Sequence, residues 1–415
     1  MKKTLSILLA LALTLGLLTG CGGTKEAETE PAAVPEIDAA PADEAGEDAE
    51  DTEDAEIPEV EAPDMEAAYA AFTEAIQKGR TAFDPDTVIA TVEGQPLTWK
   101  MYYYFITGGL QEVVYYLGEI PADFSEKVFD ETSWQDYFSD SASKEALYYL
   151  LANSKTAEMG VELSEEQKAR INGSWEDMLS RYDSEEALLA DMEEACLDKE
   201  LLLYLIESNE KLTALMTSLY GENGEKLTDE QVLAWAAERG YVRTKHVLWS
   251  FLGDDGTALD DEGKAALKKR LEGVLAELQQ LLGDDAALEA RFDEIMKAES
   301  ADPGGLESFP AGYTYTEGTM VPAFEDAAFD LTDYEISDLV ETNYGYHILL
   351  GLPLDPNGLT MDQDANTGEY MTLRQSAANE MFTSQLVTWI NDAKIEWAEG
   401  FENLDLNTVF HGEDK

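Results

Sequence analysis

Residues 241 to 352 carry a hydrophobic pattern that limits the folds open to this part of the chain. Apolar strands are predicted at residues 241 to 251 and 345 to 352. Between them lie a long helix with one apolar stripe, a second helix at about residues 286 to 298, a glycine-rich loop, and a short helix near residues 322 to 329. This order predicts an α+β unit, in which helices cover a small sheet.

Two of the chain's three histidines lie on the two predicted strands. His246 belongs to the first strand and His347 to the last, whereas His411 lies in a polar tail and no function is expected for it. A histidine buried in a strand is usually structural, so the pair alone leaves a structural and a catalytic interpretation open. The histidines do not stand at the spacing of zinc ligands, and the sequence has no phosphate-binding loop. A metal site is therefore not predicted.

Four short motifs follow His246 along the chain. They are Ser-Ala-Asp-Pro-Gly-Gly at residues 300 to 305, Gly-Thr-Met-Val-Pro-Ala-Phe-Glu-Asp-Ala-Ala-Phe at 318 to 329, Ile-Ser-Asp-Leu-Val-Glu-Thr at 336 to 342, and Gly-Tyr-His-Ile at 345 to 348. In this order they resemble the signature of the parvulin-type peptidyl-prolyl cis/trans isomerases. The resemblance implies an isomerase domain at residues 240 to 353, with a small antiparallel sheet and helices, that needs no cofactor.

The resemblance also implies which residues form the site. The residues of the catalytic network would be His246, Asp302, Thr342 and His347. The residues of the substrate pocket would be Leu306, Met320 and Phe324. Asp302 stands where the family has a cysteine or an aspartate, and its role, tuning the histidines or orienting the substrate carbonyl, stays open. The chain departs from the family where Gly304-Gly305 runs directly into Leu306, one residue shorter than the usual Gly-Gly-Asp-Leu-Gly.

These residue types suit proline isomerisation. Rotation about an X-Pro bond crosses a barrier of roughly 20 kcal/mol, because the planar amide is stabilised by resonance. An apolar pocket that holds the proline ring removes the water that stabilises the planar form, and a polar network can favour the twisted form by hydrogen bonding. Neither a covalent nucleophile nor a metal is required.

The first residues have the features of a targeting signal. Lys2 and Lys3 precede an apolar run from residue 5 to residue 18, which is shorter than the roughly 20 residues of a membrane-spanning helix. The run ends in Leu-Thr-Gly-Cys at residues 18 to 21, which resembles the lipobox of bacterial lipoproteins. We therefore expect a signal peptide at residues 1 to 20, a lipid on Cys21, and a location on the extracytoplasmic face of the cell membrane. An ordinary signal peptide followed by a chance cysteine is the alternative.

Residues 21 to 64 are predicted to be a disordered linker. From residue 24 the segment consists almost entirely of Glu, Asp, Ala and Pro, with Lys25 as its one basic residue. Such a composition buries too little apolar surface to offset its ordering entropy, and its like charges and prolines favour an extended chain. The segment is interpreted as a spacer behind the anchor, with a role in solubility alone as the alternative.

The remaining residues, 65 to 239 and 354 to 410, are predicted to be mainly helical. Residues 65 to 239 contain a short hairpin at residues 86 to 97 and two capping boxes, Ser164 to Gln167 and Thr228 to Gln231. Residues 373 to 393 form one more helix with a wide apolar stripe that needs a partner. We expect this helix to pack on the N-terminal helices, so that residues 65 to 239 and 354 to 410 form one split domain interrupted by the isomerase. This plan resembles the extracellular parvulin foldase lipoproteins, whose helical region is a SurA-like chaperone.

The net charge of the chain limits the kinds of partner that it can bind. The 87 acidic and 27 basic residues give a formal net charge of −60, which argues against binding to nucleic acid or to anionic lipid through a basic patch. Such a chain suits cationic or unfolded partners, although general acidity of a secreted protein explains the charge equally well.

Besides Cys21 the chain has only Cys196, which is expected to be a buried apolar residue in a helical pattern at residues 192 to 205.

The sequence therefore predicts an isomerase and chaperone that assists the folding of secreted proteins. Its partners would be unfolded or partly folded secreted proteins with X-Pro bonds, and it would contact the membrane through the lipid only. The oligomeric state is open, with a homodimer among the options. A holdase with a weakly active or inactive isomerase unit is the runner-up. A substrate-binding lipoprotein of an importer is a third class, disfavoured because two alternating α/β lobes are not evident.

Overall fold

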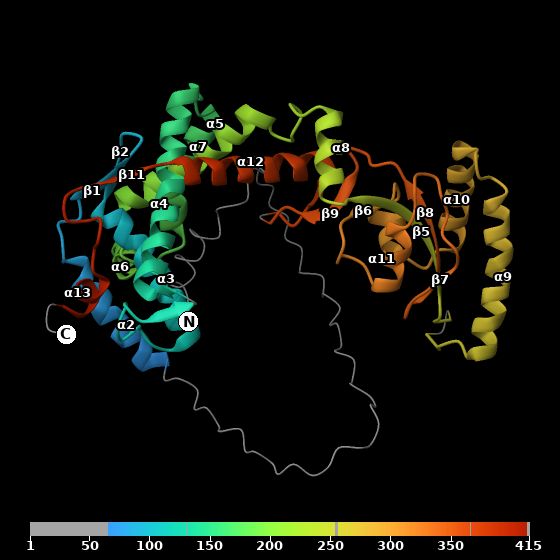
Figure 1. Ribbon diagram of the computed structural model, residues 1–415, viewed down its shortest axis with the longest axis horizontal. Coiled ribbons are helices and arrows are strands. Elements are labelled where there is room, and N and C mark those ends of the chain that lie inside the picture. The colour runs from blue at the N-terminus through green and yellow to red at the C-terminus, as the bar shows by residue number, and fades with distance from the viewer. Residues whose placement is uncertain (1–64, 130, 254–255, 366, 413–415) are drawn as a thin grey trace, which may run out of the picture.

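The computed structural model describes residues 65–129, 131–253, 256–365 and 367–412 (Figure 1). The expected signal peptide, Cys21 and the acidic linker lie outside the described residues. Among the residues described, no helix is both long and apolar enough to span a lipid bilayer. The described chain forms two lobes, one mainly helical and the other containing a four-stranded sheet.

The helical lobe is built largely from the residues before 240. Its elements in chain order are α2 (Met65–Arg80), β1 (Val88–Val92), β2 (Gln95–Thr98), α3 (Trp99–Leu117), β3 (Lys127–Phe129), β4 (Thr132–Ser133), α4 (Trp134–Met159), α5 (Glu165–Ser180), α6 (Glu185–Glu194), α7 (Lys199–Tyr220) and α8 (Asp229–Glu238). The predicted hairpin is confirmed as β1 and β2, which turn at Gly94 with a φ of 80°. Both predicted capping boxes are also confirmed, at the first residues of α5 and α8.

The second lobe contains β5 (Val242–Ser250) and β8 (Gly345–Leu352) at the centre of its sheet. The other elements of this lobe are α9 (Asp261–Gln279), α10 (Asp285–Glu299), the π-helical turn η2 (Gly304–Ser308), β6 (Tyr313–Tyr315), α11 (Pro322–Phe329) and β7 (Val340–Glu341). The strand order is β6-β5-β8-β7, and every neighbouring pair is antiparallel. The predicted α+β class and the two long strands are confirmed, whereas the short strands β6 and β7 were not predicted.

The two faces of this sheet have different roles. Val247 and Ile348 lie opposite each other and are fully buried against α9 and α10. On the other face, Leu349 packs with Phe324 and Ala328 of α11. Because side chains alternate along a strand, the neighbours of Val247 and Ile348 on β5 and β8 point toward the α11 side.

The residues after β8 return to the helical lobe. They form β9 (Leu359–Gln363), β10 (Tyr370–Thr372), α12 (Leu373–Asp392), β11 (Ile395–Trp397) and α13 (Leu406–His411). Helix α12 contacts α4, α7 and α8, and Figure 1 shows it running from beside α8 to the strand β11. Strand β11 pairs antiparallel with β1, with Trp397 opposite Ala90. The predicted helix at residues 373 to 393 is confirmed, but β9, β10, β11 and α13 were not predicted.

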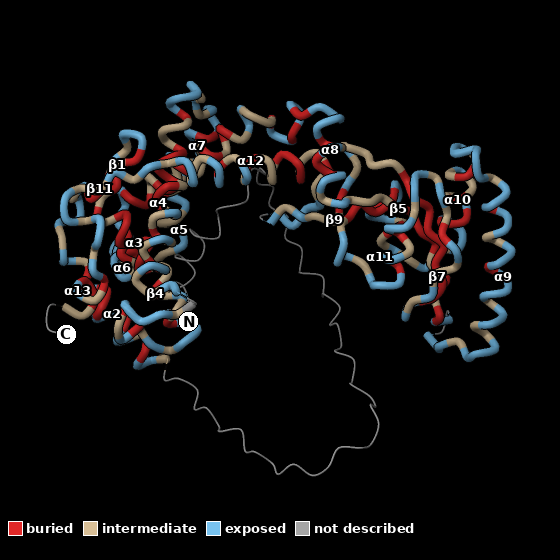
Figure 2. The backbone as a smooth tube through the Cα atoms, viewed as in Figure 1, coloured by how far each residue is buried: buried red, intermediate tan, exposed pale blue. Residues whose placement is uncertain are grey.

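The core of the helical lobe joins both ends of the described chain. Leu406, Val409 and Phe410 of α13 are buried in the same cluster as the residues of α2, α3 and α4. Figure 2 shows the buried backbone concentrated in this lobe and along β5 and β8, whereas most of α9 is exposed. Residues that follow β8 therefore complete a core that residues before β5 begin.

Two sequence interpretations need correction. His411 does not lie in a polar tail, because it belongs to α13, its Nε2 lies 3.0 Å from the carbonyl oxygen of Pro121, and its ring contacts that of Phe124 at a centroid distance of 5.6 Å. These contacts link α13 to the loop after α3.

Cys196 is buried as expected, but it lies in the turn between α6 and α7 with a φ of 54°, so the predicted continuous helix is interrupted there.

Candidate active site

The register of β5 and β8 brings the two strand histidines together. His246 lies opposite Leu349, and His347 lies opposite Leu248. The two histidines are thus diagonal neighbours on the face that α11 covers. Their rings stack with an interplanar angle of 9°, and the two Nδ1 atoms are 3.1 Å apart. Both side chains are buried.

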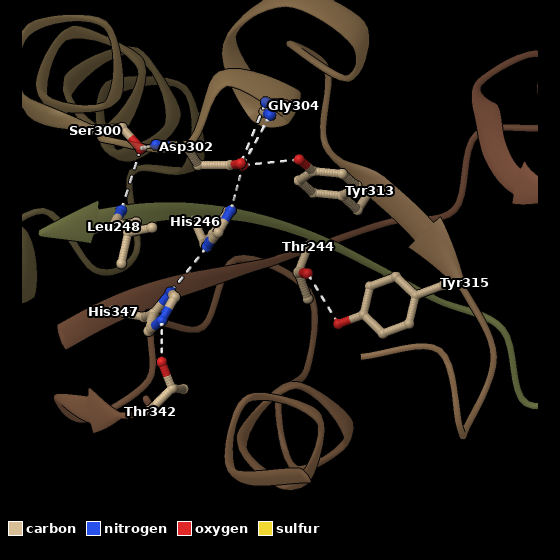
Figure 3. Close-up of polar contacts among 11 residues, drawn as sticks. Thr244, His246, Leu248, Ser300, Asp302, Gly304, Tyr313, Tyr315, Thr342 and His347 are labelled. Atoms are coloured by element: carbon tan, nitrogen blue, oxygen red, sulfur yellow. Dashed lines mark hydrogen bonds and ion pairs between the residues drawn. The ribbon is translucent and has the colours of Figure 1, made fainter. Parts of the chain in front are cut away.

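A chain of hydrogen bonds runs through this pair (Figure 3). His246 Nε2 lies 2.8 Å from Asp302 Oδ2, and His347 Nε2 lies 2.8 Å from Thr342 Oγ1. The four predicted network residues therefore occur in the order Asp302, His246, His347, Thr342. The network crosses the sheet from the loop after α10 to the turn between β7 and β8.

Asp302 is held by the glycines that follow it. Its carboxylate accepts hydrogen bonds from the backbone N–H groups of Gly304 at 3.2 Å and Gly305 at 2.8 Å. A Cβ atom on Gly305 would lie 2.7 Å from Asp302 Oδ2, and one on Gly304 would lie 2.4 Å from the hydroxyl of Tyr313. The double glycine is therefore required by close packing of the backbone around the carboxylate.

Electrostatics favour an ionised Asp302 beside an uncharged His347. Burial alone would raise the pKa of Asp302, but hydrogen bonds from His246, Tyr313 and the Gly305 backbone hold this pKa well below its ordinary value of 3.8. Burial, and next the neighbouring His246, lower the pKa of His347 from 6.5 to about 4. Both shifts follow from the low polarity of the site and from the partners that each group meets there.

The partners also determine a consistent placement of protons. An ionised Asp302 only accepts hydrogen bonds, so His246 donates from Nε2. When His246 has no proton on Nδ1, the neutral His347 donates from its own Nδ1 and accepts at Nε2 from the hydroxyl of Thr342. Every polar atom of the two rings then has a partner.

An apolar wall stands against the histidines. The ring of Phe324 is nearly perpendicular to both imidazoles, with centroid distances of 5.0 Å to His246 and 5.5 Å to His347. Met320 is partly buried in the same cluster. Leu306 is not part of it and instead packs against the core between the sheet and the helices α9 and α10. In the shortened glycine loop, the turn η2 brings the buried Phe309 into the Phe324 cluster.

Sequence reasoning missed two tyrosines of the short strand β6. The hydroxyl of Tyr313 donates to Asp302 Oδ2 at 2.7 Å, and Tyr315 Oη lies 3.2 Å from Thr244 Oγ1. Burial, and next the hydrogen bond to the anionic Asp302, raise the pKa of Tyr313, so its hydroxyl remains protonated and able to donate. The alternation Tyr-Thr-Tyr at residues 313 to 315 was the available signal for a strand with two tyrosines on one face.

A polar network beside an aromatic wall, on a small antiparallel sheet, is the arrangement that the resemblance to the parvulin-type peptidyl-prolyl isomerases implies. Residues 246–351 match the family model of the rotamases described as the PPIC-type PPIase domain. The chain belongs to this family.

Three relatives illustrate the extent of the similarity. Over 115 residues the chain is 30% identical to the peptidyl-prolyl cis-trans isomerase Pin1 of Arabidopsis thaliana, covering 27% of this chain and 96% of that protein. It is 25% identical over 231 residues to the putative peptidyl-prolyl cis-trans isomerase Cbf2 of Campylobacter jejuni, covering 53% of this chain and 78% of the relative. It is 31% identical over 136 residues to the foldase protein PrsA of Bacillus subtilis, covering 32% of this chain and 38% of the relative.

The low pKa of His347 predicts a specific loss of stability in mild acid. The folded protein resists protonation of His347 until about pH 4, whereas the unfolded chain takes up this proton near pH 6.5. The unfolded state therefore binds more protons in this window, and stability falls as the pH is lowered through it. We expect the free energy of unfolding to fall by about 3 kcal/mol more between pH 6.5 and pH 4 in the wild type than in His347→Gln.

Urea denaturation at a series of pH values measures this difference. The contribution of Asp302 is lost at lower pH, because the ordinary value of its pKa is 3.8. Stability curves of the wild type and His347→Gln that stay parallel from pH 7 to pH 4 would contradict the assignment of a neutral, buried His347.

Proposed function

We propose that this protein is an extracytoplasmic foldase, whose isomerase site catalyses cis/trans isomerisation of X-Pro bonds in unfolded or partly folded secreted proteins. The observation that carries the proposal is the network from Asp302 to Thr342 facing the ring of Phe324. Similarity to foldase and isomerase relatives supports the same function.

In this mechanism the site stabilises the twisted amide. Phe324 and Met320 receive the proline ring and exclude the water that favours the planar, more polar amide. His246 and His347 form a polar wall beside this pocket that needs no rearrangement, because the two rings are bonded to each other through Nδ1 and Asp302 and Thr342 hold their Nε2 atoms. Asp302 acts by orienting His246, and Thr342 acts by orienting His347. No bond to the substrate is formed or broken apart from hydrogen bonds.

We propose that residues 240 to 353 are the isomerase domain, and that residues 65 to 239 together with 354 to 410 are a chaperone domain. The contacts of α12 with α4, α7 and α8, and the pairing of β11 with β1, support this division. Holding of unfolded clients is assigned to the helical domain. The two activities are thereby carried by different parts of the chain and can be separated by mutation.

Phe324→Ala tests the isomerase assignment. Loss of a buried aromatic wall worth about 1.5–3 kcal/mol is expected to lower kcat/KM for a short Pro-containing peptide by about 10- to 100-fold. Phe329→Ala is the matched control, because Phe329 lies on the same helix but is 37% exposed. The control is expected to keep the wild-type rate, and both variants are expected to suppress client aggregation as the wild type does.

The same measurements separate the two functional classes. Circular dichroism establishes that each variant is folded before rates are compared. A wild-type rate no higher than the uncatalysed rate would leave a holdase with an inactive isomerase unit. Equal rates for the wild type and a folded Phe324→Ala would refute the pocket assignment.

The charge around the site predicts a preference among substrates. Residues 300 to 351, which follow α10 and supply every site residue except those of β5, contain 10 acidic residues and no lysine or arginine. The six basic residues at positions 264 to 297 lie on α9 and α10, which cover the opposite face of the sheet. A peptide with a cationic residue beside proline is therefore attracted to the site, and one with an anionic or phosphorylated residue is repelled.

We expect a Lys-Pro peptide to have a kcat/KM about three- to tenfold higher than the matched Glu-Pro peptide at low ionic strength. The ratio should approach one in about 1 M salt, where the screening length is only about 3 Å. Line-shape or exchange NMR measures both rates without a coupled protease. A preference for Glu-Pro, or a preference that salt leaves unchanged, would show that these acidic residues do not select the substrate.

We propose that the chain is anchored to the outer face of the membrane by a lipid on Cys21, behind an acidic spacer. The motif at residues 18 to 21 supports this proposal. Cys21→Ser is expected to abolish incorporation of a labelled fatty acid and to release the protein from the membrane fraction. A variant that stays in the membrane fraction to the same extent as the wild type would contradict the lipid anchor.

A further inference from the structure

The hairpin of β9 and β10 lies beyond the residues that match the isomerase family, yet it contacts the isomerase site. Strand β9 contacts β6, and Met361 packs against the cluster that contains Phe324. On β10, the ring of Tyr370 meets Phe309 at a centroid distance of 4.7 Å and an interplanar angle of 69°. The family match covers residues 246–351, so Met361 and Tyr370 are additions to the site from a separate segment.

A series of contacts leads from this hairpin to the catalytic network. Phe309 is buried and its ring lies 4.8 Å from that of Tyr313. Tyr313 donates its hydroxyl to Asp302, and Asp302 accepts from His246. Figure 3 shows the Tyr313 hydroxyl pointing at the Asp302 carboxylate, beside the histidine pair.

The hairpin itself is fixed in place. The hydroxyl of Tyr241 donates to Asp362 Oδ2 at 2.5 Å, which ties β9 to the residue before β5. Thr360 is fully buried and its hydroxyl donates to the carbonyl oxygen of Met371 on the opposite strand. Strand β10 continues directly into α12, whose first turn is closed by a capping box between Thr372 and Gln375. The position of Tyr370 is therefore set by the start of α12.

We propose that the β9–β10 hairpin positions Asp302 for catalysis through Tyr370, Phe309 and Tyr313. The rate of isomerisation then depends on a segment outside the isomerase family region and on the helix that this segment begins. The inference rests on the proposed isomerase function. Tyr370 is a positioning residue, because it acts on Asp302 through two other side chains.

The physical basis is the packing of one aromatic side chain on the next. Tyr370 is 37% exposed, and its ring contacts that of Phe309, which also contacts the ring of Tyr313. The contact of Tyr370 with Phe309 is edge-to-face, which favours one relative orientation of these two rings. Without the Tyr370 ring, Phe309 gains room to move and Tyr313 is no longer held at hydrogen-bond distance from Asp302. The loss falls mainly on kcat, because Tyr370 itself is not among the residues that pack with Phe324 and Met320.

Variants of the full chain test the role of the ring. Tyr370→Ala is expected to lower kcat about three- to tenfold with little change in KM, whereas Tyr370→Phe keeps the ring and restores most of the rate. Leu359→Ala is the matched control, since Leu359 lies on the same hairpin, is 40% exposed and belongs to no apolar cluster of the described residues. The control is expected to retain the wild-type kcat. Circular dichroism and thermal unfolding establish that each variant is folded.

A double-mutant cycle with Tyr313→Phe tests the route of the effect. Tyr313→Phe keeps the ring but removes the hydroxyl that donates to Asp302. If Tyr370 acts through that hydroxyl, Tyr370→Ala has little further effect on kcat in the Tyr313→Phe background. Fully additive losses in a folded double variant, or a loss confined to KM, would overturn the positioning role.

The outcome is distinct from the test of the proposed function. A wild-type protein with no catalysed rate refutes the isomerase function itself. An active wild type whose rate is matched by a folded Tyr370→Ala refutes only the role of the hairpin.

Discussion

The pairing of β5 with β8 is the constraint on which the isomerase site depends. Its register makes His246 and His347 diagonal neighbours on one face, while Val247 and Ile348 fill the core on the other. A slip of one residue would exchange the two faces and bury imidazoles among the leucines of α9 and α10. The apolar face therefore fixes the geometry of the polar one, and the hydrogen bonds of the site complete an arrangement that hydrophobic burial has already selected.

Sequence motifs predicted most of the site because its residues lie in short segments of recognisable order. The structure brings His246, Asp302, Thr342, His347, Met320 and Phe324 together as the resemblance implied. It does not bring Leu306 to them, because the shortened loop forms the turn η2 and directs this residue to the core of α9 and α10. Tyr313 was missed because its contact with Asp302 depends on a strand of three residues and on the path of that same turn.

The periodicity of apolar residues predicted the long helices, including α12, since a stripe every 3.6 residues is a local signal. The short strand β11 has no such signal. Its partner β1 is distant in the chain, as the 305 positions between Thr91 and Glu396 illustrate. Likewise, the contact of His411 with Pro121 depends on an approach between residues 290 positions apart. Long-range pairings of short segments are set by the packing of the whole lobe, which single-sequence patterns do not contain.

The register of β5 and β8 has a further consequence for how the chain is assembled. Arg243 near the start of β5 lies opposite Leu352 at the end of β8, so the isomerase unit begins and ends at neighbouring points. Once folded, the unit connects α8 to the hairpin before α12 as a short loop would. The entropy cost of bringing β11 to β1 is lower for this reason. During synthesis from the N-terminus onward, the inserted unit is complete before β11 and α13 emerge. The inserted unit can therefore fold first. By holding its two ends together, it reduces the number of chain conformations through which β11 must pass before it pairs with β1.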